Sequence, residues 1–492
     1  MEKEIRLSYI KKIDEVNKNG KYKPDWSSLS EYGVPEWYKK AKFGVFIHWG
    51  LFTVPEYFSE WYPRLMYYKG NPVYWHHKRK YGKNFNYRDF IELFRAENFD
   101  AAEWVSAVKN CGARFIMPVA EHHDGFKLYN SDLNEWTSVK TGPKKDFLGA
   151  IKTECEKQNL IFSASSHRAE HFWFLNGGKT IGFKNETQDE KYREFYGACE
   201  NVHKFNNLYT LLRQEHGIEP TQEWLEDWLV SSCELIDKYR PSSLFFDWWV
   251  SYKAFRPYMK KFLAYYYNRS VEWGKQVCVY YKSDAAMYNC AIFDRERGQL
   301  ENISPYIWQG ETSTSYNSWS YCTTNKFKTP EIIACNFLDV ISKNGCFVLN
   351  IGPMADGTIC GEEKNILKQL GKWTEMNSEA VWDTQPYKLY GEGKKQKSGS
   401  FNEHFSYTKK DYRFTYKTGT VYAFALKPNG RDKFNIKSLG ISADLFNCII
   451  KNITVLGFDT KCSWIESKSG LLIKTSEKIN STMPVCFKIL LE

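Results

Sequence analysis

Short apolar runs recur along the first three quarters of the chain, and each ends in a polar or charged side chain. Three of them precede His48, Glu121 and Asp247, namely Phe43–Ile47, Phe115–Ala120 and Ser243–Phe246. Each run has the length and composition of one buried strand. Parallel β/α barrels collect the carboxyl ends of their strands on one face and build their active sites there. The pattern therefore predicts a barrel enzyme whose site contains these polar residues.

Segments with helical patterns separate the apolar runs. Asp100–Glu103 has the sequence of a capping box, and we expect the helix that it begins to end near Gly112. Residues 222–239 place their apolar side chains on one stripe, which is typical of an amphipathic helix. Residues 329–345 begin with a Thr-Pro-Glu start signal and lead into another apolar run. This alternation predicts an α/β fold of eight strand–helix units at about residues 40–380, a (β/α)8-like, TIM-type barrel.

The pattern changes after residue 384. Short runs of β-forming residues, separated by turn residues, occur at 413–417, 420–426, 450–456 and 470–474. They predict a small C-terminal antiparallel β-sandwich. We therefore divide the chain into a catalytic barrel domain at residues 1–384, with residues 1–35 as an N-terminal extension, and a sandwich domain at residues 385–492. Residues 391–399 are expected to form the loop that enters the sandwich.

Charge and hydropathy argue against two classes of partner. The net charge is +10, but 68 Lys and Arg residues are interspersed with 58 Asp and Glu residues, so we expect no nucleic-acid binding. No apolar run reaches the roughly 18 residues that a membrane-spanning helix needs, so we expect no membrane segment. Residues 1–6 are charged and lack the apolar core of a signal peptide. We expect a cytoplasmic protein, or a secreted one if a signal has been removed.

Cysteine and aromatic usage narrow the chemistry further. The 13 cysteines are odd in number and show no CxxC spacing, which favours reduced thiols over a disulfide framework or a zinc cluster. Aromatic residues make up 17% of the chain. Aromatic faces stack on the C–H faces of sugars, but aromatic residues also fill ordinary cores. The composition is therefore compatible with a carbohydrate site and does not require one.

Asp247 is the sharpest candidate for a catalytic group. It lies between the aromatic pairs Phe245-Phe246 and Trp248-Trp249, where a carboxylate is costly unless it is hydrogen-bonded or needed for a reaction. The alternative is an aspartate that caps the next helix. Hydrolysis of a glycosidic bond requires two carboxyl groups. The candidates for the second group are Glu296, Glu301 and Glu311.

The local sequence favours Glu296 over Glu311 as this second carboxyl group. Glu296 follows the strand-like residues 291–293 and can point into the barrel, with Arg295 and Arg297 on the opposite side. Glu311 belongs to a polar segment that we expect to be a flexible loop. A general acid must be held in a fixed position, and a strand holds its side chains better than a loop does.

A family resemblance rests on five motifs, which are Phe43–Gly50, Glu60–Tyr62, His122–Phe126, Phe246–Trp249 and Leu349–Pro353. Together they resemble glycoside hydrolase family 29, the α-L-fucosidases. The similarity extends from about residue 35 to the C-terminal part, where Tyr390–Gly393 and Arg413–Thr415 are similar to the family's β-sandwich. The resemblance implies a (β/α)8-like barrel that hydrolyses α-L-fucosides with retention of configuration, and it implies no metal ion and no cofactor.

The resemblance also implies roles for individual residues. Asp247 matches the family's nucleophile, and Glu296 is the best match to its acid/base. The residues expected to bind substrate are His48, Glu60, Trp61, His122, His123, His167, Trp248, Trp308 and Trp319. His167 stands where many relatives have a tyrosine. Residues 308–311 and 319–321 depart from the commoner family forms, and we expect this part of the chain on the side of the leaving group.

Other polar residues have simpler explanations. His122–Asp124 could bind a metal ion, but adjacent histidines rarely chelate one ion, so we expect no metal there. His76 and His77 lie in a polar segment and are expected at the surface. Asn350 is either a ligand at the rim of the site or a turn residue at the end of a strand.

The expected function is that of a retaining exo-α-L-fucosidase that acts on a fucosylated oligosaccharide or glycoconjugate. The alternative is an inactive fucose-binding protein on a hydrolase scaffold. The presence of both Asp247 and Glu296 favours the enzyme. The sequence leaves the linkage, the natural glycan and the oligomeric state open.

Overall fold

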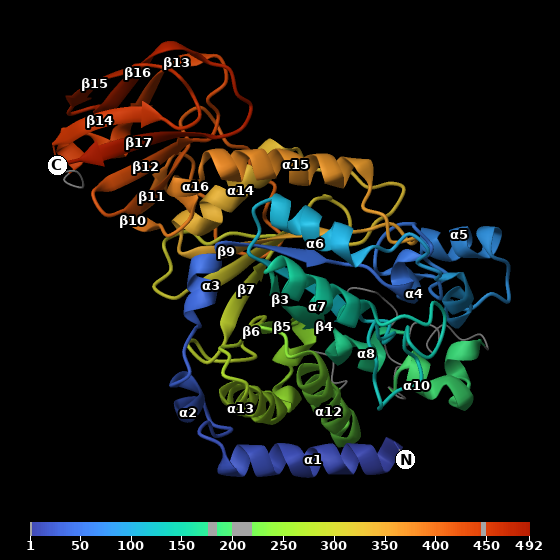
Figure 1. Ribbon diagram of the computed structural model, residues 1–492. Helices are drawn as coiled ribbons and strands as arrows, with labels where there is room; N and C mark the ends of the chain where they lie inside the picture. Colours follow the sequence, from blue (N-terminus) through green and yellow to red (C-terminus); the bar gives the residue numbers. More distant parts are fainter. Residues whose placement is uncertain (1, 176–184, 199–218, 444–448) are drawn as a thin grey trace.

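The computed structural model describes residues 2–175, 185–198, 219–443 and 449–492. A parallel barrel surrounded by helices forms the larger part, and two antiparallel sheets form the smaller part beside it (Figure 1). Among the described residues no helix combines the length and the apolar character needed to cross a membrane.

The barrel is one closed parallel sheet. Its strands are β1 (Phe43–Ile47), β2 (Phe115–Glu121), β3 (Ile161–Phe162), β4 (Ala164–Ser166), β5 (Ser243–Phe246), β6 (Cys278–Tyr281), β7 (Ile292–Glu296), β8 (Trp308–Ser313) and β9 (Gly345–Ile351). β1 pairs in parallel with both β9 and β2, which closes the sheet. Because β3 and β4 together occupy one position beside β2, the barrel has eight strand positions. The predicted TIM-type barrel is confirmed.

Most residues of these strands are buried, and about half of them are β-branched or aromatic. Every residue of β1, β2, β5 and β9 is buried. Gly44 is required in β1 because a Cβ there would lie 2.2 Å from the ring of Phe115. The carboxyl ends of all the barrel strands meet at one face, where the functional site lies.

Helices cover the outside of the barrel. The long ones are α6 (Ala101–Asn110), α7 (Phe147–Gln158), α12 (Gln222–Tyr239), α13 (Arg256–Glu272), α14 (Pro330–Ser342) and α15 (Gly361–Met376). The side chain of Asp100 caps α6 and that of Thr329 caps α14, as the sequence predicts. The amphipathic helix expected at residues 222–239 is α12.

The prediction of eight regular strand–helix units is wrong at two places. Residues 282–291 and 297–307, which join β6 to β7 and β7 to β8, contain no helix. Both connections are shorter than the dozen or more residues that a helical crossover needs. The loop expected at residues 391–399 instead spans residues 393–411, because residues 391 and 392 belong to a strand. This loop, which we call the barrel-edge loop, is hydrogen-bonded to the carboxyl end of β7.

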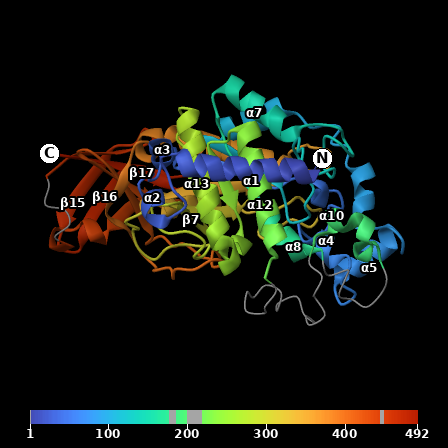
Figure 2. The same cartoon turned by 90° about the horizontal axis from the view of Figure 1, so that it is seen from below.

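Several shorter helices and an N-terminal helix complete the larger part. The short ones are α2 (Trp26–Ser30), α3 (Glu36–Ala41), α4 (Tyr62–Leu65), α5 (Pro72–Lys80), α8 (Arg168–Phe174), α10 (Arg193–Tyr196) and α16 (Ser378–Val381). The N-terminal helix α1 (Glu2–Asn19) lies across α12 and α13 on the underside of the barrel (Figure 2). An ion pair of 2.5 Å between Lys12 and Asp237 fixes α1 to α12.

The C-terminal part is the predicted β-sandwich. One sheet has the order β10 (Gln385–Glu392), β11 (Tyr412–Lys417), β12 (Thr420–Ala425), β17 (Val485–Leu491) and β14 (Ile450–Val455). The other has the order β13 (Arg431–Ile436), β16 (Gly470–Ile479) and β15 (Cys462–Ser467). All pairs are antiparallel, and Phe414, Phe434 and Phe487 belong to an apolar core of their own. The sandwich is joined to the barrel by a buried ion pair of 2.6 Å between Arg413 and Asp339 of α14.

Candidate active site

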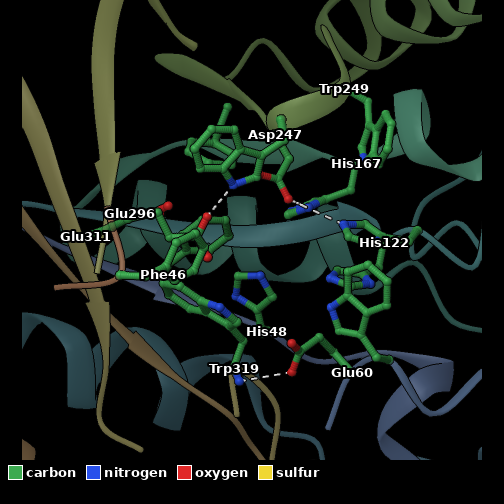
Figure 3. A pocket seen from close by; sticks show the side chains of 15 residues that line it. Phe46, His48, Glu60, His122, His167, Asp247, Trp249, Glu296, Glu311 and Trp319 are labelled. Atoms are coloured by element: carbon green, nitrogen blue, oxygen red, sulfur yellow. Dashed lines mark hydrogen bonds and ion pairs between the residues drawn. The ribbon is translucent and has the colours of Figure 1, made fainter. Parts of the chain in front are cut away.

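A cavity of about 490 Å³ opens at the carboxyl ends of the barrel strands, a size suited to a small ligand. Its lining consists of Phe46, His48, Glu60, Trp61, His122, His123, His167, Phe245, Asp247, Trp248, Trp249, Glu296, Glu311, Trp319 and Phe401. Every residue that the sequence predicts for the site is among them except Trp308. In Figure 3, Glu296 and Glu311 lie to the left, His122 to the right and Asp247 above.

Asp247 follows β5 directly and points into the cavity (Figure 3). It precedes a short 3-10 helix, but its side chain makes no capping hydrogen bond, so the capping role is wrong. Its Oδ2 accepts hydrogen bonds from His123 Nε2 at 3.3 Å and from His167 Nδ1 at 3.2 Å. Oδ1 accepts no hydrogen bond from the described residues, so this oxygen is free to contact a ligand.

The two histidines keep Asp247 ionised. Burial favours the neutral acid and would raise the pKa of Asp247, but the hydrogen bonds from His123 and His167 hold it well below its ordinary range. Burial lowers the pKa of His167 even though Asp247 opposes the shift. A neutral His167 that donates from Nδ1 has Nε2 left as an acceptor, and Ser165 Oγ lies 3.3 Å from it.

Asn350 holds His48 in position. It is neither a ligand at the rim of the site nor only a turn residue at the end of a strand. Asn350 Oδ1 accepts from the backbone N–H of His48 at 3.1 Å and from its Nδ1 at 2.7 Å. The Asn350 amide donates to Ser313 Oγ and to the carbonyl oxygen of Trp319. Asn350 is therefore a buried positioning residue behind the site, and His48 presents Nε2 as an acceptor.

His122 and His123 form a parallel pair, with ring centroids 4.2 Å apart and planes 10° apart. Burial, with repulsion from neighbouring imidazoles, holds the pKa of both His48 and His122 well below the ordinary value, so these rings are neutral. The side chain of His122 makes no hydrogen bond within the part of the chain that the structure describes. It therefore remains available to a bound ligand.

Glu296 and Glu311 project into the cavity from neighbouring strands. They are directly paired in the register of β7 and β8, and paired residues of adjacent parallel strands lie on the same face. Alternating burial along β7 places Asp294 and Glu296 inside and Arg295 outside, as the sequence predicts. The same expectation is wrong for Arg297, which follows the strand and is buried with its guanidinium over the ring of Trp319. The expectation of a flexible loop at Glu311 is wrong, because residues 308–313 form a fully buried strand.

Lys282, which is not among the residues predicted from the sequence, connects the acidic side chains. The buried ammonium lies 2.6 Å from Asp294 Oδ2 and 3.2 Å from Glu296 Oε2, and it also pairs with Glu311 Oε1. Burial alone would lower the pKa of Lys282, but these carboxylates raise it well above its ordinary value. Lys282 directly follows the buried strand β6, so the strand-end pattern that indicated Asp247 also marks Lys282.

One lysine cannot balance three carboxylates, and this favours the protonated forms of the two glutamates. Burial raises the pKa of Glu296, Lys282 opposes the rise and the charge of Asp247 adds to it. Burial, followed by repulsion from Asp294, raises the pKa of Glu311 well above its ordinary value. Trp248 Nε1 also donates to Glu296 Oε2 at 2.5 Å, which fixes the position of that carboxyl group.

The rim of the cavity is built by two loops that are hydrogen-bonded to each other. Glu60 Oε2 accepts from the backbone N–H of Trp319 at 3.0 Å and from Ser318 Oγ at 3.2 Å. Trp61 packs edge-on against His123, with ring centroids 5.8 Å apart. Glu60, Trp61 and Trp319, all expected from the sequence, thus lie together at the cavity.

Trp308 is the predicted ligand that the structure places elsewhere. Its indole is buried and donates to the carbonyl oxygen of Lys343 at 3.0 Å. Successive side chains of a strand point to opposite faces, so Trp308 lies on the face of β8 opposite Glu311 and packs toward the helix layer. The residue type alone does not show whether Trp308 faces the cavity or the helix layer. The register of β8 determines which face it occupies.

The expectation for His76 and His77 is wrong for His77. Its side chain is fully buried, with Nδ1 at 2.9 Å from Tyr62 Oη and Nε2 at 2.8 Å from the carbonyl oxygen of Phe85. Burial lowers its pKa to about 4. His76 is partly exposed and stacks on Tyr57 outside the cavity. The charged neighbours in the sequence hide the fact that His77 lies on the inner face of α5.

The metal site considered for His122–Asp124 does not form. Asp124 is buried and accepts hydrogen bonds from Tyr87 Oη at 2.5 Å and from the backbone N–H of Phe126. A different trio, His48, His122 and His167, has ligand atoms within 4.8 Å of one another and could hold a cation. However, both ring nitrogens of His167 already have partners in Asp247 and Ser165.

Comparisons with known proteins place this cavity in a family. A family model described as Alpha-L-fucosidase matches residues 9–379. The chain belongs to the α-L-fucosidase family. Tissue alpha-L-fucosidase of Homo sapiens is 27% identical over 478 residues, which cover 95% of this chain and 90% of that protein. The tissue alpha-L-fucosidase of Mus musculus is 25% identical over 492 residues, with 95% and 93% covered.

Solved structures agree with this α-L-fucosidase membership. The alpha-fucosidase of Thermotoga maritima has a TM-score of 0.75 and 26% identity, and the match covers 95% of this chain and 100% of that one. A structure of the same protein in complex with fucose gives the same TM-score. The predicted family and fold are confirmed, and the chain is a glycoside hydrolase of the α-L-fucosidase family.

Proposed function

We propose that this protein is a retaining exo-α-L-fucosidase that releases terminal α-L-fucosyl residues from fucosylated oligosaccharides or glycoconjugates. The observation that carries the proposal is a single cavity in which Asp247 is held ionised by two histidines while burial raises the pKa of Glu296. Retaining hydrolysis needs one carboxylate as nucleophile and one carboxylic acid as proton donor. The relative from Thermotoga maritima, solved with fucose, supports the choice of sugar.

In the first step Asp247 Oδ1 forms a bond to C1 of the fucosyl residue. The bond between C1 and the glycosidic oxygen breaks, and Glu296 gives its proton to that oxygen. The product is a fucosyl ester of Asp247, with the configuration at C1 inverted once. The hydrogen bonds from His123 and His167 to Oδ2 leave the other oxygen of the carboxylate free for this attack.

In the second step water hydrolyses the ester. Glu296, now a carboxylate, takes a proton from water while the water oxygen bonds to C1 and the ester bond to Asp247 breaks. A second inversion restores the original configuration. Lys282, 3.2 Å from Glu296 Oε2, stabilises the glutamate charge between the two steps.

The remaining lining suits a small sugar with both hydroxyl groups and a methyl group. His48 offers an acceptor nitrogen, and the side chain of His122 makes no hydrogen bond among the described residues. Phe46 and Phe245 give the cavity an apolar surface for the C6 methyl group. The alternative of an inactive fucose-binding protein is not favoured, because both carboxyl groups needed for catalysis line the cavity.

The test is the configuration of the first sugar released. Wild-type protein is incubated with a chromogenic aryl α-L-fucoside, and early products are followed by proton NMR. The expected product is α-L-fucose, which later equilibrates with its anomer. Release of β-L-fucose would mean a single inversion and would remove Asp247 from the role of nucleophile. Absence of turnover would favour the binding protein.

A further inference from the structure

The barrel-edge loop crosses from the sandwich to the carboxyl end of β7. Gln299 and Gly399 exchange two backbone hydrogen bonds of 3.2 and 3.1 Å. The backbone N–H of Phe401 donates to the carbonyl oxygen of Glu296 at 3.1 Å, and that of Asn402 donates to the carbonyl oxygen of Arg297 at 3.0 Å. The loop is thus hydrogen-bonded directly to the backbone of the proposed acid/base.

A buried ion pair fixes the loop just after Phe401. Glu403 pairs with Arg297 at 2.9 Å and with Lys328 at 2.8 Å, and all three side chains are buried. The Arg297 guanidinium also donates to the carbonyl oxygens of Ser315 and Ser318. Phe401 therefore lies in a segment whose backbone is held on both sides.

The side chain of Phe401 is nevertheless 61% exposed and lines the cavity. Its backbone is left-handed, with φ at +57°, a conformation that is unusual for a bulky residue. Such conformations persist where surrounding contacts impose them, and they concentrate at functional sites. A fixed backbone that presents an exposed aromatic ring to an active site indicates a contact with a ligand.

Trp248 continues the aromatic surface from Phe401 to the acid/base. The two rings are nearly parallel, at 18°, with centroids 6.2 Å apart. Trp248 Nε1 donates to Glu296 Oε2 at 2.5 Å. Trp248 and Phe401, which we call the aromatic wall, therefore begin at the carboxyl group that protonates the leaving oxygen and extend outward to the exposed rim.

We propose that the aromatic wall is the binding subsite for the leaving group, and that it takes a pyranose ring with an apolar C–H face. This inference rests on the proposed function. A general acid must lie within hydrogen-bonding distance of the leaving oxygen, so the sugar attached to that oxygen lies beside Glu296 and Trp248. Phe401 then covers the far part of the same ring.

The chemistry of the wall predicts what it recognises. Phe401 offers no hydrogen-bond donor or acceptor, and the one donor of Trp248 is used by Glu296. The subsite therefore selects for an apolar ring face and not for one pattern of hydroxyl groups. Sugars with several axial C–H bonds on one face, such as β-galactosides and N-acetylglucosaminides, fit this description, and more than one linkage is compatible with it.

The test compares substrates with and without a leaving-group ring. The kcat/KM of wild type, Phe401→Ala and Phe401→Trp is measured with a fucosyl-galactose disaccharide and with α-L-fucosyl fluoride. Phe401→Ala is expected to lose at least about ten-fold more kcat/KM on the disaccharide than on the fluoride. Phe401→Trp is expected to retain most of the disaccharide activity, because an aromatic face remains.

A matched control separates a ligand contact from a general surface effect. Tyr288 is 58% exposed and does not line the cavity. Tyr288→Ala should therefore leave kcat/KM unchanged on both substrates. Equal losses of Phe401→Ala on both substrates, or no loss on either, would overturn the subsite. Failure of the wild type to hydrolyse the fluoride would instead count against the proposed function, since the fluoride needs no leaving-group subsite.

Discussion

Asp247 and Glu296 are both buried carboxyl groups, yet their surroundings move their pKa values in opposite directions. Hydrogen bonds from His123 and His167 outweigh burial at Asp247 and lower its pKa, whereas burial dominates at Glu296 and raises its pKa. A pair of titratable groups whose pKa values are driven apart is the pattern expected of an acid and a nucleophile in one site. The environment of each residue, and not its type, therefore underlies the roles that we propose for them.

These two shifts predict the pH dependence of kcat/KM. A lowered pKa keeps Asp247 ionised in mildly acidic solution, and a raised pKa keeps Glu296 protonated above the roughly 4.3 of a free glutamic acid. Activity should therefore persist at mildly acidic pH and fall as the pH rises through the pKa of Glu296. In Glu296→Gln the alkaline fall should disappear. A wild-type profile that rises with pH over that range would contradict the assignment of acid and nucleophile.

Substitution of the two glutamates tests which one is the acid/base. Glu296→Ala should impair substrates with poor leaving groups far more than activated aryl fucosides, which need little protonation. Added azide should restore turnover and give β-L-fucosyl azide, because the anion attacks the fucosyl ester without a base. Glu311→Ala is the matched comparison, since both glutamates pair with Lys282. Azide rescue of Glu311→Ala alone would exchange the two roles.

The strand-end pattern was enough to find some of the cavity residues, whereas Glu60, Trp61, His167 and Trp319 were indicated by the family resemblance alone. Asp247 and His48 each follow an apolar run, and the barrel topology brings such positions together. Glu311 was misplaced because β8 is buried but polar, with the sequence Trp-Gln-Gly-Glu-Thr-Ser. Its side chains face a polar site interior, so hydropathy does not mark it as a strand. Phe401 could not be found, because its place depends on a contact between segments about 100 positions apart along the chain.

At the level of elements, the overall division into barrel and sandwich was predictable because it follows from periodicity. The helices α12 and α14 carry a clear apolar stripe or start signal and lie where the sequence places them. The absence of helices before and after β7 was not expected. The apolar pattern identifies strands and helices, but it does not predict that two strands are joined by a short loop. Their absence leaves the end of β7 open to the barrel-edge loop.

The close approach of this loop predicts the effect of a larger residue at Gly298. A Cβ there would lie 1.9 Å from the carbonyl oxygen of Gly399. Gly298→Val should therefore displace the loop and lower the free energy of unfolding by about 1–3 kcal/mol, with faster proteolysis within residues 393–411. Gly361→Ala is the control, since no atom lies within 4 Å of its added Cβ. Unchanged stability and proteolysis in Gly298→Val would show that the loop does not pack as described.

At the scale of the whole molecule, buried ion pairs join the two parts. Asp339 of α14 pairs with Arg413 of β11 at 2.6 Å and with Lys343 at 2.7 Å, and all three side chains are buried. Burial alone would lower the pKa of Arg413, but Asp339 raises it above its ordinary value. Both cations thus depend on one carboxylate for compensation.

Removal of that carboxylate should destabilise the protein strongly. Asp339→Asn leaves Arg413 and Lys343 buried without a counter-charge, and the free energy of unfolding is expected to fall by about 3–5 kcal/mol. Denaturant-induced unfolding of wild type and Asp339→Asn measures this loss of free energy. Lys488→Gln breaks the partly exposed pair with Glu379 and should cost about 1 kcal/mol or less. A similar small loss in Asp339→Asn would mean that the interface does not rely on this carboxylate.

The barrel-edge loop also bears on how such enzymes diversify. Phe401 and Glu403 belong to the C-terminal segment, whereas the proposed catalytic groups belong to the barrel. Exchange of residues 385–492 with those of a relative would therefore replace Phe401, the outer part of the aromatic wall, and leave Trp248, Asp247 and Glu296 in place. Recombination at this junction would then change the outer part of the leaving-group subsite in one event, with the barrel sequence unaltered.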